Sequence, residues 1–189
     1  MLNSLLNEVC DCRVCADVLP LGPRPDGQIS AMARFLIASQ APGRNAHESG
    51  IPFSEVSGDR LRQWMDVSTD EFCDEVSVAI LPMGLCYPGC LLRGGNARPR
   101  SECAALWRGR LLQHMHYLRL TLLVGAHAQA GAQGPGTMTE RVKGFCDYLP
   151  TVFPLPHSSW PSRHWTARNP WFDADVLPAL RGAVERALA

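Results

Sequence analysis

Residues 39–61 read SQAPGRNAHESGIPFSEVSGDRL and follow the apolar run RFLIA at residues 34–38. The following residues, LRQWM at 61–65, read as the start of a helix. Between them, three glycines and two prolines are spread among polar residues, a composition typical of a loop. Connections of this kind usually run about two to six residues, and longer ones are usually functional or disordered. We therefore predict a ligand-binding loop at the carboxyl end of a buried strand, which presents Phe53, rather than an ordinary connection.

The rest of the chain alternates short apolar runs with segments of helical spacing. We predict strands at residues 33–39, 76–81, 119–124 and 151–155, and Pro154 places the last of them at an edge of the sheet or ends it early. We predict helices at about 2–9, 57–67, 101–116 and 173–188, and a short one after Gly125. This alternation indicates an α/β fold in three α/β/α layers, with a central, mostly parallel four-stranded sheet.

Composition limits the classes of protein to which the chain could belong. Its 189 residues fit one domain, residues 1–189, and its formal net charge of zero gives no overall attraction to nucleic acid or membrane. No apolar run approaches the length of about 18 residues that suggests a membrane span, and no secretory signal is recognisable. We therefore expect a cytoplasmic monomer that does not bind membranes.

Three predicted loops leave the carboxyl ends of strands, at residues 39–58, 82–100 and 156–172. In a parallel sheet these ends lie on one edge, where ligands bind in open α/β sheets. We therefore expect the three loops to form one site.

Eight cysteines in a cytoplasmic chain favour metal ligation over a disulfide framework. Cys12 and Cys15 form a C-x2-C pair, and Cys86 and Cys103 lie far downstream. Four such thiolates can surround a zinc ion or an iron–sulfur cubane, and the count does not choose between them. An unmetallated knuckle is the alternative. Of the remaining cysteines, Cys10 and Cys90 are possible substitutes as ligands, whereas Cys73 and Cys146 are predicted to be lone buried thiols.

The order and spacing of several motifs carry a resemblance to a known family. They are SQAPG at 39–43, GIPF at 50–53 with Gly58 before the helix, NARP at 96–99, HSSWP at 157–161 and the four spaced cysteines. Over residues 10–180 the chain resembles the uracil-DNA glycosylase superfamily, and most closely its iron–sulfur branch, family 4.

The resemblance implies a DNA glycosylase that starts base excision repair by hydrolysing the N-glycosidic bond of uracil or of a related deaminated or damaged base in DNA. It also makes a 4Fe-4S cluster the preferred occupant of the cysteine site, with zinc second. The residues that it implies are Gln40 and His157 for catalysis; Ala41, Pro42, Gly43 and Phe53 for substrate binding; Ser159, Trp160 and Arg163 for DNA contact, with Trp160 as an apolar wedge; and Cys12, Cys15, Cys86 and Cys103 for the metal.

The chain departs from the family pattern at two positions that bear on chemistry. Gln40 replaces the acidic residue of the first motif, and glutamine can hold a water but cannot act as a general base. Pro82 stands where the family tends to have an asparagine that reads the base. Uracil, hypoxanthine and damaged pyrimidines therefore all stay open as substrates. Two other functions stay open: a weak or inactive iron–sulfur DNA-binding protein with the same fold, and a small-molecule or nucleotide enzyme.

Overall fold

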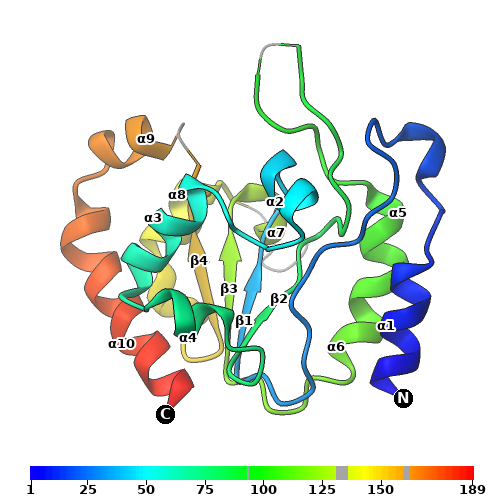
Figure 1. Cartoon of the computed structure of the whole chain (residues 1–189). Helices are drawn as coiled ribbons and strands as arrows, with labels where there is room; N and C mark the ends of the chain where they lie inside the picture. Colours follow the sequence, from blue (N-terminus) through cyan, green and yellow to red (C-terminus); the bar gives the residue numbers. More distant parts are fainter. Residues whose placement is uncertain (93, 131–135, 160–161) are drawn as a thin grey trace.

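A parallel sheet forms the centre of the protein, shown as a computed structural model in Figure 1, which describes residues 1–92, 94–130, 136–159 and 162–189. Its four strands lie in the order β2-β1-β3-β4 and are all parallel. They are β1 (Phe35–Ala38), β2 (Val78–Ile80), β3 (Leu120–Val124) and β4 (Val152–Leu155). The predicted α/β fold with a four-stranded sheet is confirmed.

The edge position of β4 agrees with its proline. Pro154 pairs in register with Leu123 of β3, and β4 has no neighbour on its other side in the strand order of the described residues. Proline lacks the N–H that a central strand would need to donate, so it is tolerated at an edge. The strands are otherwise rich in Val, Leu, Ile and Phe because both of their faces are covered.

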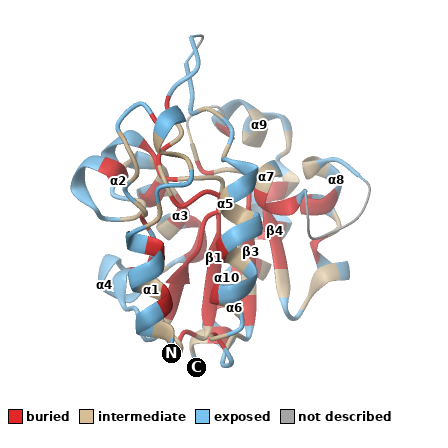
Figure 2. Cartoon of the chain, turned by 90° about the vertical axis from the view of Figure 1, so that its right-hand side faces the viewer, coloured by how far each residue is buried: buried red, intermediate tan, exposed pale blue. Residues whose placement is uncertain are grey.

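Helices cover both faces of the sheet (Figure 1). Because successive side chains of a strand point to opposite faces, the side chains of β1 and β2 enter two separate cores in turn. Phe35 and Ile37 enter one core, and Leu36 enters the other. The first core includes residues of α3 (Val56–Met65), α4 (Thr69–Cys73), α8 (Met138–Lys143) and α10 (Leu177–Leu188). The second includes residues of α1 (Leu2–Cys10), α5 (Ser101–Cys103), α6 (Gly109–Leu112) and the π-helical turn Ala104–Arg108 between them. Figure 2 shows the strands buried between these layers.

Several short elements differ from the sequence prediction. The long loop after β1 contains a helix, α2 (Arg44–Ser49), which ends at Gly50 with φ +74°. Six residues are too few to show a clear helical period, which explains why the pattern did not reveal it. The predicted helix at 101–116 ends earlier, at Leu112. The sequence also did not indicate α4, α8 or α9 (Ser162–Arg168), whereas the predicted short helix is present as α7 (Ala126–Gln129).

The remaining turns complete the chain. They are the 3-10 turns Ala16–Val18 and Phe145–Tyr148 and the π-helical turn Phe172–Val176 before α10. In the described ranges, no helix has both the length and the apolar character needed to cross a bilayer.

Candidate functional site

A large cleft opens where β1, β2 and β4 end, and the three predicted loops contribute to it. It encloses about 2410 Å³ of space, including open solvent. Side chains and backbone from residues 39–60, from Pro82 and residues 94–96, and from residues 157–159 line it. Gln40, Ala41, Pro42, Gly43, Phe53, His157 and Ser159 are therefore brought together, although they come from segments more than a hundred residues apart.

His157 follows β4 and is held as a neutral imidazole. Burial, reinforced by the charge of the nearby His127, lowers the pKa of His157 below its ordinary value. The backbone N–H of Ser159 donates to Nδ1 of His157 over 3.1 Å. Because Nδ1 accepts a hydrogen bond, the single proton of the neutral ring lies on Nε2. The ring can therefore donate one hydrogen bond without carrying a positive charge.

The absence of a side chain at Gly125 makes room for this imidazole. Gly125 follows β3 with φ +87°, and a Cβ there would lie 3.1 Å from Cβ and 3.2 Å from Cδ2 of His157. Glycine is therefore favoured at position 125 for two reasons: its backbone has a positive φ, and a side chain there would press against His157.

The segment after His157 is fixed by contacts with α3 and α9. Arg60 of α3 donates from Nη1 to the carbonyl oxygens of Ser158 and Ser159, each over 2.9 Å. The hydroxyl of Ser162 donates to the carbonyl oxygen of His157. Ser158 is fully buried, and its Oγ has no hydrogen-bond partner among the described residues, so a polar group is available beside the catalytic candidate.

Gln40 connects the first motif to the segment that follows β2. Its side-chain Nε2 donates to the carbonyl oxygen of Ala97 over 2.9 Å, and its backbone carbonyl accepts from the N–H of Gly84 over 3.0 Å. The amide nitrogen is thus occupied by a structural contact. The side-chain oxygen is the atom of Gln40 that can accept a hydrogen bond from a water molecule.

Phe53 lies at the cleft in a backbone conformation that few residues adopt. Its φ is +56°, and its ring packs edge-on against Phe72 with 5.9 Å between centroids. Gly58 allows this arrangement, because a Cβ at that position would lie 1.9 Å from the carbonyl oxygen of Phe53. Left-handed conformations of non-glycine residues cluster at functional sites, where the surrounding structure holds them.

Two carboxylates in the cleft were not identified from the sequence. Burial raises the pKa of Glu55, and burial raises the pKa of Asp26 to about 6, against the lowering effects of Arg24 and the Gly27 N–H. Glu55 Oε1 lies directly against the first motif, since a Cβ on Gly43 would be 1.8 Å from it. The position of Glu55, two residues after Phe53, was the available signal, but only the fold shows that its side chain turns back to the motif.

Two arginines lie together beside the cleft. Burial and the positive charge of Arg163 lower the pKa of Arg60. Such a local concentration of cations favours phosphate on a chain whose formal net charge is zero. Of the residues predicted to contact DNA, Arg163 is one of these two arginines, and the Ser159 carbonyl accepts from the other, Arg60. Trp160 lies outside the described residues.

The four predicted ligand cysteines line one small cavity on the other side of the segment after β2. Its lining includes Cys12, Cys15, Cys86 and Cys103, and its empty space is about 400 Å³ with open solvent included. Burial raises the pKa of Cys86 to about 11, and the other three thiols reinforce the effect. Among the described residues, no three Cys, His, Asp or Glu side chains are grouped closely enough to hold a metal ion.

The other cysteines lie outside this cavity. Cys10 is exposed, and the Cys90 thiol is 2.8 Å from the Tyr87 hydroxyl. The prediction that Cys73 and Cys146 are buried is wrong, because both are exposed. Cys73 ends the short helix α4, and Cys146 lies in the 3-10 turn Phe145–Tyr148. The sequence pattern did not reveal either element.

One comparison with known proteins bears on this site. A family model described as "Uracil DNA glycosylase superfamily" matches residues 27–181. The match includes most of the cleft, Cys86 and Cys103, but it begins after Cys12 and Cys15.

Proposed function

Because the chain belongs to the uracil-DNA glycosylase superfamily, we propose that it releases uracil or a related deaminated or damaged base from DNA by hydrolysing the N-glycosidic bond. The observation that carries the proposal is a neutral His157, with its proton on Nε2, in the same cleft as Phe53 and the first motif. This reaction would start base excision repair.

The base must leave the stack before its glycosidic bond can be reached. In the cleft, Phe53 would stack on the extruded base, and aromatic stacking is worth about 1–3 kcal/mol per base. The backbone of Ala41, Pro42 and Gly43 would border the sugar and the base. The buried hydroxyl of Ser158, which has no partner among the described residues, is a further group that could bind a polar edge of the base.

As the carbon–nitrogen bond breaks, its electron pair moves to the departing base. The Nε2–H of His157 would donate to a base oxygen on which this negative charge develops. A donor fixed before the reaction stabilises such charge without reorganisation. A neutral imidazole suits the role because it donates a hydrogen bond without having to transfer its proton.

A water molecule must attack the sugar carbon and lose a proton. The side-chain oxygen of Gln40 would orient this water, and Glu55 would take its proton. Glu55 suits this role better than Asp26 for two reasons. Its carboxylate lies against Gly43 of the first motif, and Asp26 already accepts from the Gly27 N–H and faces Arg24. Burial raises the pKa of both carboxylates, which makes each a stronger base, so position rather than pKa favours Glu55.

Base release from a panel of oligonucleotides tests the function. The panel carries uracil, hypoxanthine, xanthine and oxidised pyrimidines, in single and double strands, and abasic sites are detected by alkaline cleavage. We expect the wild type to release at least one base. We expect Glu55→Gln to slow release about 10²-fold, within the range for general bases, with Asp26→Asn as the matched cleft control. Tight DNA binding without release of any base would favour the inactive DNA-binding protein.

We further propose that Cys12, Cys15, Cys86 and Cys103 hold a 4Fe-4S cluster. All four line one cavity, and the backbone N–H of Leu85 donates to Cys103 Sγ over 3.3 Å, a contact that tunes cluster thiolates. When bound, the cluster would tie the N-terminal segment to the segment after β2.

Iron analysis and absorbance of protein purified without oxygen test this assignment. We expect about four irons per chain, a brown colour and broad absorbance near 400 nm. Cys86→Ser should lose the iron and lower the melting temperature, whereas Cys146→Ser, at an exposed thiol, should keep both. Stoichiometric zinc in colourless, folded protein would contradict the assignment.

A further inference from the structure

A hairpin formed by residues 89–92 and 94–97 projects from the protein beyond the sheet's carboxyl edge. In Figure 1 it is the green segment that rises from the end of the molecule opposite both termini, and Figure 2 shows it exposed. Its tip carries Leu91 and Leu92, which are 56% and 109% exposed. Two neighbouring leucines held in water at the end of a projection have no packing role in the described part of the chain.

The hairpin has a defined backbone. Cys90 and Asn96 form an antiparallel bridge, the N–H of Leu91 donates to the carbonyl of Gly95 over 2.9 Å, and the N–H of Ala97 donates to the carbonyl of Gly89 over 2.8 Å. Gly94 and Gly95 have φ of +86° and +83°, and an added Cβ on either would meet nothing within 4 Å. Their backbone is therefore open to close approach by a ligand.

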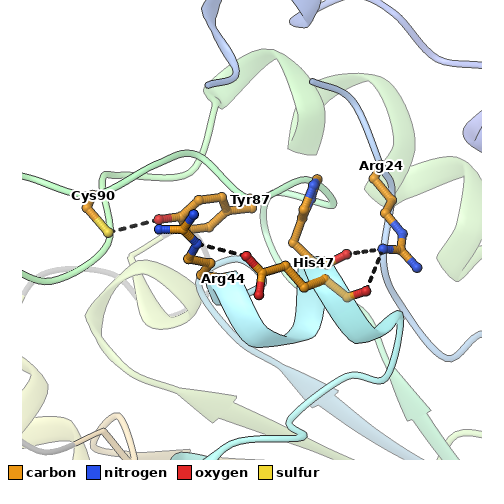
Figure 3. A network of polar contacts seen from close by, with 6 residues as sticks. Arg24, Arg44, His47, Tyr87 and Cys90 are labelled. Atoms are coloured by element: carbon orange, nitrogen blue, oxygen red, sulfur yellow. Dashed lines mark hydrogen bonds and ion pairs between the residues drawn. The ribbon is translucent and has the colours of Figure 1, made fainter. Parts of the chain in front are cut away.

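The base of the hairpin is anchored to the elements that build the cleft. Gln40 binds Ala97, and the Tyr87 hydroxyl contacts the Cys90 thiol. Figure 3 shows Arg44 of α2 beside Tyr87, with its guanidinium bonded to Glu48 over 2.9 Å. Arg24 in turn donates to the backbone carbonyls of His47 and Glu48 at the end of α2. The base of the hairpin is therefore tied to the first motif through Gln40.

The hairpin also borders the cleft itself. Gly94, Gly95 and Asn96 are among its lining residues, together with Gln40 and His157. Arg98, at the foot of the hairpin, is exposed and suits contact with a phosphate. Figure 1 shows the hairpin and α9 rising from the same end of the sheet, so DNA lying over the cleft would meet both.

We propose that Leu91 and Leu92 are a wedge that enters the base stack of duplex DNA next to the extruded nucleotide. Proteins that distort DNA insert leucine and other apolar side chains between base steps, which offsets the cost of unstacking. The leucines are buried only when DNA is present, which accounts for their exposure here. This inference rests on the DNA-binding part of the proposed function, because a protein that extrudes a base from the duplex leaves such a gap.

The test uses a duplex with a stable abasic analogue next to 2-aminopurine, whose fluorescence rises on unstacking. The variant carries Leu91→Ser together with Leu92→Ser. Val76→Ser is the matched control, since Val76 is 59% exposed before β2, at the other end of the sheet. We expect the double variant to bind the duplex roughly tenfold more weakly, the equivalent of losing one stacking contact, with a smaller fluorescence rise. Its affinity for the single strand and its melting temperature should stay at the wild-type values.

The possible outcomes distinguish failure of the wedge proposal from failure of the proposed base release. Equal duplex binding and equal fluorescence for the double variant and the wild type would overturn the wedge, and so would an equal loss on single and double strands. Wild type that shows the expected wedge signals but releases no base from the oligonucleotide panel would support the wedge and overturn the proposed catalytic function.

Discussion

His157→Ala is expected to slow base release about 10²- to 10³-fold, the usual cost of removing one preorganised donor for developing charge. The alanine removes the Nε2–H but leaves the backbone of the segment held by Arg60, so the cleft should keep its shape. DNA affinity should change little, because the donor acts on charge that appears as the bond breaks.

Single-turnover rates with saturating protein measure this effect. His116→Ala is the control, because His116 is exposed in the turn before β3. The pH profile gives a second readout: since burial and His127 lower the pKa of His157, the wild-type rate should show no loss from imidazole protonation near the ordinary histidine value of about 6.5. An unchanged rate in His157→Ala would remove this residue from the mechanism.

Gly58→Ala is expected to destabilise the protein by about 2–3 kcal/mol, in the upper range for overpacking. The new Cβ would lie 1.9 Å from the carbonyl oxygen of Phe53, a backbone atom that cannot move without shifting the loop. Gly58 lies in α3, where alanine is intrinsically favoured over glycine by about 1 kcal/mol, so any loss must come from this clash.

Urea unfolding gives the free energy, and Gly109→Ala is the matched control. Gly109 also lies in a helix, but its added Cβ would meet nothing within 4 Å, so stability should rise by up to about 1 kcal/mol. In Gly58→Ala we also expect weaker stacking of the base, because the Phe53 backbone must leave its conformation. Equal stability of the two variants would show that the loop adapts to the Cβ.

The sheet could be predicted from sequence because each strand is a short, mostly apolar run. Pro154, whose missing N–H restricts where it can pair, indicated that β4 lies at an edge or ends early, and the structure shows the edge position. The short helices could not be predicted in the same way. α2 and α9 contain six and seven residues, and neither is long enough for an amphipathic pattern to stand out.

The residues of the candidate site also fall into two groups, those that the sequence identified and those that it did not. Gln40, Phe53 and His157 were identified because they stand in spaced motifs after strands, and the cleft includes all three. Glu55 and Arg60 were missed because their roles depend on where α3 places them: one carboxylate against Gly43, and one guanidinium on the carbonyls after His157. Such contacts between distant segments leave no local pattern in the sequence.

The bond from Gln40 to Ala97 makes position 40 epistatic with the hairpin. The Nε2–H donates to a carbonyl over 2.9 Å, and a glutamate there would face that carbonyl with a second acceptor. Gln40→Glu would therefore introduce an acid at the first motif only by releasing the hairpin's anchor. In this chain, a change of the amide at position 40 therefore also changes how the projecting hairpin is anchored.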